Sequence, residues 1–93
     1  MTRVVIPGAL RQFTDGAAHV DLALADGANL ADLLDALEAD RPRLARRIRD
    51  EQGELRRFVN VYVDGEDART CGELGASVPA GAEVLILPSV AGG

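Results

Sequence analysis

The sequence predicts a single α+β domain, in which a mixed sheet of about four to five strands packs on one main helix. Only one long segment has the periodicity of an amphipathic helix, and short segments with strand character lie before and after it. The 93 residues suffice for one hydrophobic core, because a chain this short buries only about 60–65% of the surface that it exposes when unfolded. One helix covers one face of such a sheet, so we expect the other face to stay open.

Two strands are expected before the helix. The first is the apolar run at residues 3–7, which ends at a Pro-Gly pair. Residues 8–18 are rich in turn formers and favour a loop. Residues 19–24 alternate between apolar and polar side chains, as in a half-buried strand, so the two strands would form a hairpin across this loop. The apolar positions of the second strand are Val20, Leu22 and Leu24.

The main helix is predicted from about residue 30 to residue 39. Asn29 directly before it is a suitable N-cap. Pro42 stops this helix and can open a second, shorter one, whose apolar pair is Leu44 and Ile48. Four leucines at i, i+3, i+4 and i+7 form the apolar stripe of the main helix, namely Leu30, Leu33, Leu34 and Leu37.

Two further strands are expected after the helices. The strongest strand signal in the chain lies at residues 58–63, and the pair Asp64-Gly65 directly after it indicates a tight turn. The last strand is expected at residues 83–87. Pro88 would end its pairing, because proline has no N–H donor.

The sequence divides into a folded domain at residues 1–88 and a flexible tail at residues 89–93. The tail is made of small residues without a helical or strand pattern. Its last four residues reach about 13 Å when extended, and glycines, which lack a Cβ atom, can enter a channel too narrow for other residues. A terminal carboxylate is unreactive until ATP adenylates it, after which a sulfur donor can convert it into a nucleophilic thiocarboxylate. The acyl group would belong to Gly93, and the tail residues beside it are Val90, Ala91 and Gly92.

The composition excludes several classes of function. The net charge is −5 and all ten basic residues are arginine, which argues against nucleic acid or an anionic membrane as a partner. No lysine is present to form a Schiff base or to accept an isopeptide bond. A single cysteine, Cys71, forms neither an internal disulfide nor a cysteine-based metal site, and no metal site is predicted. Without a signal peptide or an apolar run of membrane length, the chain is expected in the cytoplasm.

Two stretches of the chain resemble a known family. Residues 55–67, Leu-Arg-Arg-Phe-Val-Asn-Val-Tyr-Val-Asp-Gly-Glu-Asp, and residues 84–93, Val-Leu-Ile-Leu-Pro-Ser-Val-Ala-Gly-Gly, are similar to the ThiS/MoaD family of ubiquitin-like sulfur carriers. The resemblance covers essentially the whole chain, and within the family it is strongest to the CysO branch. It implies a β-grasp fold, which agrees with the predicted order of elements.

The resemblance also implies a function and a set of partners. Gly93 would be adenylated by an activating enzyme of the ThiF/MoeB type that uses Mg-ATP, so the carrier would bind no cofactor itself and would not be an enzyme. The sulfur would pass to an acceptor enzyme, in the CysO branch a cysteine synthase, and a zinc metalloprotease would then release the new cysteine. Four alternatives stay open: a MoaD-like small subunit of molybdopterin synthase, a sulfur donor for thiamine or another metabolite, a protein modifier, and a plain interaction module.

Partners are expected to dock on the open face of the sheet. If Val59, Val61 and Val63 face the helix, the alternate residues of that strand face the other way, and the same alternation applies to the first and last strands. An apolar patch on a small protein is a candidate docking site, unless the segment 66–82 covers part of it. The predicted docking residues are Val5, Phe58, Tyr62, Leu85 and Leu87.

The other candidate residues have simpler interpretations. Cys71 has no clustered partner and is typical of a buried or idle thiol, and His19 is expected at the surface on the polar side of its strand. The arginines at 41–49 are expected to form a solvated helix face that balances the acidic main helix, and contact with an acidic partner is the alternative. Arg56 and Arg57 are also expected to be solvated, with guidance of a partner as the alternative. No phosphate-binding glycine loop is present, so ATP would be bound by the activating enzyme.

Overall fold

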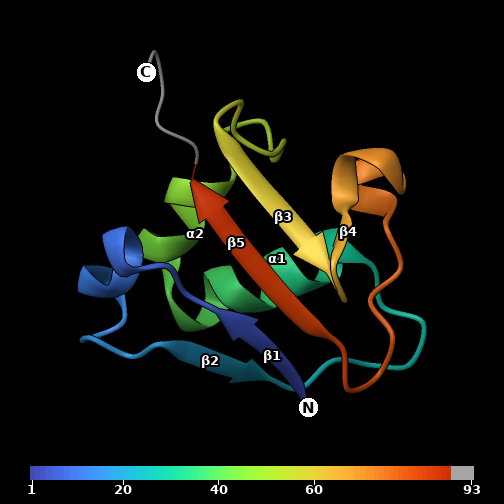
Figure 1. The fold of residues 1–93 in the computed structure, drawn as a ribbon, viewed down its shortest axis with the longest axis horizontal. Helices are drawn as coiled ribbons and strands as arrows, with labels where there is room; N and C mark the ends of the chain where they lie inside the picture. Colours follow the sequence, from blue (N-terminus) through green and yellow to red (C-terminus); the bar gives the residue numbers. More distant parts are fainter. Residues whose placement is uncertain (89–93) are drawn as a thin grey trace.

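The computed structural model describes residues 1–88, and it has a five-stranded sheet with α-helices on one face (Figure 1). The predicted α+β class with one main helix is confirmed. The strands are β1 (Thr2–Val5), β2 (His19–Leu22), β3 (Val59–Val63), β4 (Glu66–Asp67) and β5 (Glu83–Pro88). The α-helices are α1 (Leu30–Asp40) and α2 (Pro42–Ile48), and short 3-10 helices are η1 (Gly8–Phe13), η2 (Ala68–Thr70) and η3 (Glu73–Gly75).

The last strand along the described chain lies at the centre of the sheet. The strand order is β2-β1-β5-β3-β4, and β5 is parallel to β1 but antiparallel to β3. The pairs β1–β2 and β3–β4 are antiparallel hairpins. The predicted mixed sheet is therefore confirmed, and β5 is the strand that joins its two hairpins.

The core lies between this sheet and α1. Alternate residues of the strands point toward the helix, as the sequence predicts, and Val59, Val61 and Val63 are all buried. Burial of these aliphatic side chains is the main favourable contribution to folding, at about 25 cal/mol per Å² of apolar surface. The side chains that are completely buried include Val4, Val84 and Ile86 from the sheet, Ile6 directly after β1, and Leu30, Leu33, Leu34 and Leu37 from α1.

Helix α1 begins at a complete capping box. The Asn29 side chain accepts a hydrogen bond from the Asp32 backbone N–H at 2.9 Å, and the Asp32 carboxylate accepts one from the Asn29 N–H at 3.0 Å. Two backbone donors that the helix leaves without intrahelical partners are thereby satisfied. Arg49, which follows α2, pairs with Asp35 and Glu38 on α1, so the two helices are also linked by charge. Within residues 1–88, no helix is long and apolar enough to span a bilayer.

The predicted tight turn after β3 is confirmed. Val63 and Glu66 are opposite each other in the β3–β4 hairpin, so only two residues connect the strands. Both have positive φ, 49° at Asp64 and 85° at Gly65, which is the backbone that the commonest two-residue hairpin turn requires. Asp tolerates this conformation better than most residues, and Gly adopts it without steric cost.

The structure corrects the predicted boundaries of β2 and β3. β2 ends at Leu22 rather than Leu24, because its partner β1 begins at Thr2, the residue opposite Leu22. β3 begins at Val59 rather than Phe58, because Val59 is opposite Pro88 at the end of β5. In each case the partner strand determines how far pairing extends.

The predictions for Pro88, for residues 8–18 and for the first strand were also partly wrong. Pro88 does not stop the strand before it but is its last residue, since a terminal position can lack an N–H donor without loss of the ladder. The segment 8–18 contains η1, whose Leu10 is buried in the core. It folds back because the Arg11 side chain donates to the Ile6 carbonyl at 3.0 Å. β1 covers Thr2–Val5 instead of residues 3–7.

The capping box leads to a first prediction. Replacing Asn29 with Ala should lower the free energy of unfolding by about 1 kcal/mol, because the Asp32 N–H loses its acceptor. Asn29→Asp keeps an acceptor oxygen, so its free energy of unfolding should remain close to that of the wild-type protein. Urea denaturation followed by circular dichroism would measure both. Equal stability of the Ala and Asp variants would show that the cap contributes little.

Candidate functional site

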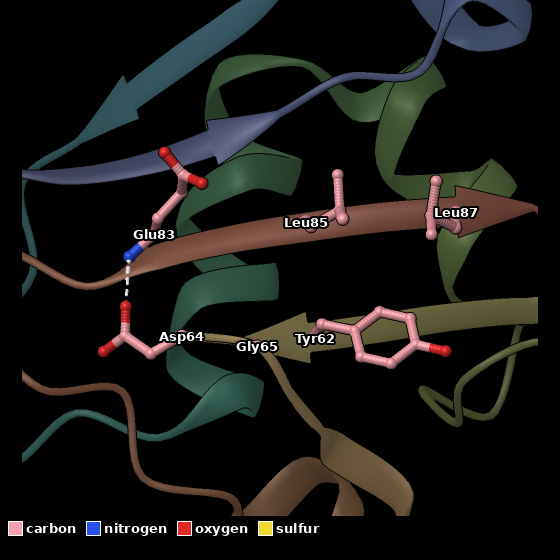
Figure 2. A pocket seen from close by; sticks show the side chains of 6 residues that line it. All are labelled: Tyr62, Asp64, Gly65, Glu83, Leu85 and Leu87. Carbon is pink, nitrogen blue, oxygen red and sulfur yellow. Dashed lines mark hydrogen bonds between the residues drawn. The ribbon is translucent and has the colours of Figure 1, made fainter.

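A shallow depression of about 600 Å³ lies on the sheet face opposite α1 (Figure 2). It runs along β3 and β5, so its side chains come from the two strands that meet at the centre of the sheet. Apolar side chains occupy the part nearer the end of β5, and carboxylates occupy the other end. The lining residues are Tyr62, Asp64, Gly65, Glu83, Leu85 and Leu87.

Strand register explains why the apolar side chains meet there. Tyr62 of β3 is directly opposite Leu85 of β5, and Val5 of β1 is paired with Leu85 on the other side. Residues paired in this way lie on the same face. Leu87 is two residues further along β5 and is 41% exposed, whereas Tyr62 and Leu85 are half-buried. The structure therefore brings together four of the predicted docking residues, Val5, Tyr62, Leu85 and Leu87.

The acidic end of the depression is fixed by the β3–β4 turn. The Asp64 carboxylate accepts a hydrogen bond from the Glu83 N–H at 2.9 Å (Figure 2), and the Asp64 N–H donates to the Glu83 carbonyl at the same distance. This exchange holds the start of β5 against the turn. The sequence analysis identified Asp64 only as a turn residue, and nothing in the local pattern indicates that its side chain reaches β5.

Phe58 does not lie with the other predicted docking residues. It precedes β3, is 45% exposed, and lines a separate depression of about 340 Å³ beside Pro88. The Arg57 guanidinium lies 5.7 Å from the centre of its ring. The predicted single patch is thus two neighbouring surfaces, one on the open face and one where β5 ends. The separation arises because Val59 and Pro88 form the last pair of the ladder, so Phe58 lies beyond the sheet.

Arg69 holds the segment before β3 in place, and the sequence analysis did not identify it. Its guanidinium donates to the Asn60 side-chain oxygen at 2.9 Å and to the carbonyls of Arg56 and Arg57 at 2.9 and 3.4 Å. β4 is only two residues long. Beyond it, the Arg69 side chain supplies the hydrogen bonds that a longer strand would form along this edge of β3. A planar group with several fixed donors suits that task better than a lysine.

The segment 66–82 packs against the core rather than over the depression. Ala68, Ala76 and Val78 are buried and belong to the hydrophobic core, and the depression is lined by residues of the β3–β5 pair and the turn after β3. The apolar side chains on the open face therefore remain accessible. The alternative that this segment covers them does not hold for the residues that line the depression.

Cys71 and His19 are both at the surface. The Cys71 thiol is exposed and lies 3.6 Å from a Glu66 carboxylate oxygen, so of the two predicted interpretations, a buried or an idle thiol, the structure excludes the buried one. His19 is exposed as predicted. Among residues 1–88, no group of three or more His, Cys, Asp or Glu side chains could hold a metal ion. The tail residues Val90, Ala91, Gly92 and Gly93 lie outside the described residues.

A mixed five-stranded sheet with one main helix on one face and a central C-terminal strand is the β-grasp fold of ubiquitin-like proteins. The chain belongs to the ThiS family, whose sequence model matches residues 4–93. It is 41% identical over 92 residues to the sulfur carrier protein CysO of Mycobacterium tuberculosis, covering 97% of this chain and 96% of that protein. It is 36% identical over 78 residues to small archaeal modifier protein 1 of Haloferax volcanii, covering 84% and 85%.

A solved structure agrees with this assignment. In the crystal structure of the Amycolatopsis orientalis BexX/CysO complex, a chain that is 39% identical to this one superposes with a TM-score of 0.87, and all of both chains is covered. The predicted family and its CysO-like character are confirmed. Its closely similar relatives are small sulfur carrier proteins, and this chain is likewise a ThiS-type ubiquitin-like carrier rather than an enzyme.

Arg69 leads to a second prediction. Arg69→Ala should lower the free energy of unfolding by about 1–2 kcal/mol, because the carbonyls of Arg56 and Arg57 and the Asn60 amide lose a charged donor. The free energy of unfolding of Arg69→Lys should lie between those of Arg69→Ala and the wild-type protein, since one ammonium group cannot reach all three acceptors. Arg3→Ala is a matched control: its exposed ion pair with Asp21, at 3.5 Å, should contribute less than about 1 kcal/mol. Equal losses for Arg3→Ala and Arg69→Ala in urea denaturation would contradict the assignment.

Proposed function

We propose that this protein carries sulfur as a thiocarboxylate on Gly93 and donates it in cysteine biosynthesis. The observation that carries the proposal is the 41% identity to a sulfur carrier, CysO, over 97% of the chain, together with a ThiS family match that extends to residue 93. Chemistry at a terminal carboxylate needs no catalytic group in the carrier itself. The protein would then be a co-substrate whose folded part serves for recognition.

The chemistry would proceed in two displacements at Gly93. A carboxylate oxygen attacks the α-phosphorus of ATP and pyrophosphate leaves, which gives an acyl-adenylate. A sulfur donor then attacks the carbonyl carbon and AMP leaves, so that sulfur replaces one oxygen. Both steps would take place in an activating enzyme of the ThiF/MoeB type, which would also bind Mg-ATP. The acceptor would be a cysteine synthase, followed by a zinc metalloprotease that releases the product.

The fold supports this use of the tail. Residues 89–93 follow β5, which is paired on both sides, so the root of the tail is attached to the most constrained strand of the sheet. The apolar depression lies on this same strand, with Leu87 one residue before Pro88. A partner that bound Tyr62, Leu85 and Leu87 would therefore lie next to Pro88, the residue from which the tail starts. The relative in Amycolatopsis orientalis occurs in a complex with BexX, which is consistent with docking of this kind.

The mass of the protein tests the function directly. After incubation with ATP, sulfide and an adenylating enzyme from the same organism, we expect the intact mass to rise by the difference between sulfur and oxygen. Fragmentation should place the change at Gly93, and a variant without Gly93 should not change. An unaltered mass, with an enzyme shown to charge another carrier, would refute the proposal.

A second candidate function is protein modification, because one relative is a small archaeal modifier protein at 36% identity. In that case Gly93 would form an amide with a lysine of another protein, since this chain contains no lysine. Conjugates that resist thiols and migrate more slowly in denaturing gels would favour it. A thiocarboxylate without conjugates would favour the carrier function.

The open face gives a further prediction. Leu87→Glu should raise the KM for the carrier in adenylation by about tenfold, because a side chain at the centre of a docking surface contributes roughly 1–2 kcal/mol. Its effect on kcat should be small. Ala23→Glu is the control, since it adds the same charge at an exposed site beyond β2. ATP–pyrophosphate exchange at varied carrier concentration would measure KM and kcat for the two variants. Equal KM values for Leu87→Glu and Ala23→Glu would exclude this face from docking.

A further inference from the structure

The arginines of this acidic protein are concentrated in one segment. Residues 41–58 contain seven of the ten arginines and three carboxylates, whereas the rest of the chain contains three arginines and twelve carboxylates. A protein with a net charge of −5 therefore has one strongly basic region. The sequence pattern predicted that the arginines at 41–49 would balance the acidic helix α1, and this is correct for Arg41 and Arg49.

Five of these arginines behave differently and form what we call the arginine rim: Arg43, Arg46, Arg47, Arg56 and Arg57. All five are exposed. Within residues 1–88, none of them forms an ion pair with a carboxylate, although Arg3, Arg41 and Arg49 each do. Arg46 and Arg56 share a depression with Glu38, Asp50 and Glu51, but they form no ion pair with them.

Three residues of the rim, Arg46, Arg56 and Arg57, lie where β5 ends. Arg56 and Arg57 line the depression beside Pro88, and the Arg56 side chain donates to the Arg46 carbonyl at 2.6 Å, which brings the end of α2 to the same place. Figure 1 shows α2 and the loop into β3 beside the end of β5. The acidic lip of the open face, Asp64 and Glu83, lies at the opposite end of the same strands. The end of β5 is thus lined by two arginines and one carboxylate, Asp50, whereas two carboxylates line its start.

Aromatic rings orient part of the rim. The guanidinium groups of Arg43 and Arg47 lie 5.9 and 5.0 Å from the centre of the Phe13 ring. A guanidinium on an aromatic face is held in place while its N–H donors at the edge stay available, in the geometry that matches a carboxylate. Ordering the side chains in advance reduces the entropy that a partner would have to offset on binding.

We propose that the arginine rim docks on an acidic surface of the protein partner, bordering the channel that accepts residues 89–93. This inference rests on the proposed function, since it takes the tail as the segment that enters the channel. Attraction at the rim and repulsion at Asp64 and Glu83 orient the carrier before contact, so that it arrives with β5 pointing toward the partner. A folded protein is the occupant that fits, because twelve carboxylates elsewhere on the chain oppose binding along a nucleic acid.

Single charge reversals test the rim. The hydrogen bonds at Arg46 and Arg57 within residues 1–88 go to their backbone carbonyls rather than to their side chains. Arg46→Glu and Arg57→Glu therefore remove no side-chain hydrogen bond or ion pair, and we expect both variants to fold. Each should lower the association rate constant with the adenylating enzyme of the same organism about three- to tenfold at low salt, and the difference should vanish at high salt. Arg3→Glu changes the net charge equally at the other end of β5 and should change the rate less than about twofold.

The outcomes separate this inference from the proposed function. Suppose that the enzyme charges Gly93 in the wild-type protein and that all three variants associate with the enzyme as fast as the wild-type protein does. The carrier function then stands, but the rim is not a docking surface. The same conclusion follows if Arg3→Glu slows association as much as the rim variants do, or if the wild-type protein binds duplex DNA through these arginines. If the wild-type protein is not charged at all, the proposed function fails, and the rim inference fails with it.

Discussion

The pairing of β5 on both of its edges is the constraint on which the rest of this structure depends. β5 joins the β1–β2 hairpin to the β3–β4 hairpin, and its Val84 and Ile86 are completely buried against α1. Without it, the sheet would be two separate hairpins, each of which is only marginally stable in water. Because β5 is central, its direction is fixed by neighbours on both sides. Whatever follows Pro88 therefore starts from a rigid base.

Side chains of β5 point alternately to the two faces of the sheet, so residues of the core alternate with residues of the proposed docking face. Residues of β5 that point toward α1 build the core, and those between them, Leu85 and Leu87, form the open face. A change in register by one residue would exchange the two sets. The two-residue turn at Asp64-Gly65 and the hydrogen bond from the Glu83 N–H to the Asp64 side chain help to exclude such a shift. The face on which we propose that partners dock is thus the one that the core does not need.

Much of the fold could be predicted from the sequence because its signals are local. Four leucines with helical spacing identify α1, Asn29 identifies its start, and the alternation of valines assigns the faces of β3. Strand ends were predicted less well, since Leu22 and Val59 end or begin pairing only where the partner strand does. The five-strand order depends on which segments meet in space, which no local pattern contains.

In the candidate site, too, features with local sequence signals were predicted, and features that depend on distant contacts were not. Val5, Tyr62, Leu85 and Leu87 follow from alternation alone, whereas Phe58 was assigned to the same patch because the end of the ladder could not be seen in the sequence. Arg69 was missed because its acceptors, the carbonyls of Arg56 and Arg57, are more than ten residues away along the chain. Backbone carbonyls carry no sequence signature. The segment before β3 was therefore expected to be positioned by its own residues, whereas a side chain from η2 positions it.

The central place of β5 also has a consequence for how the protein is made. Ribosomes build the chain from the N-terminus, so the two hairpins and both α-helices are synthesised before the strand that must lie between them. Contacts between β1 and β5 join residues about eighty positions apart, and such non-local pairings form late. Before residue 88 has left the ribosome, the inner edges of β1 and β3 have no partner, and exposed edges of this kind are prone to aggregation. A chain that ended before β5 would lack the strand that completes the sheet.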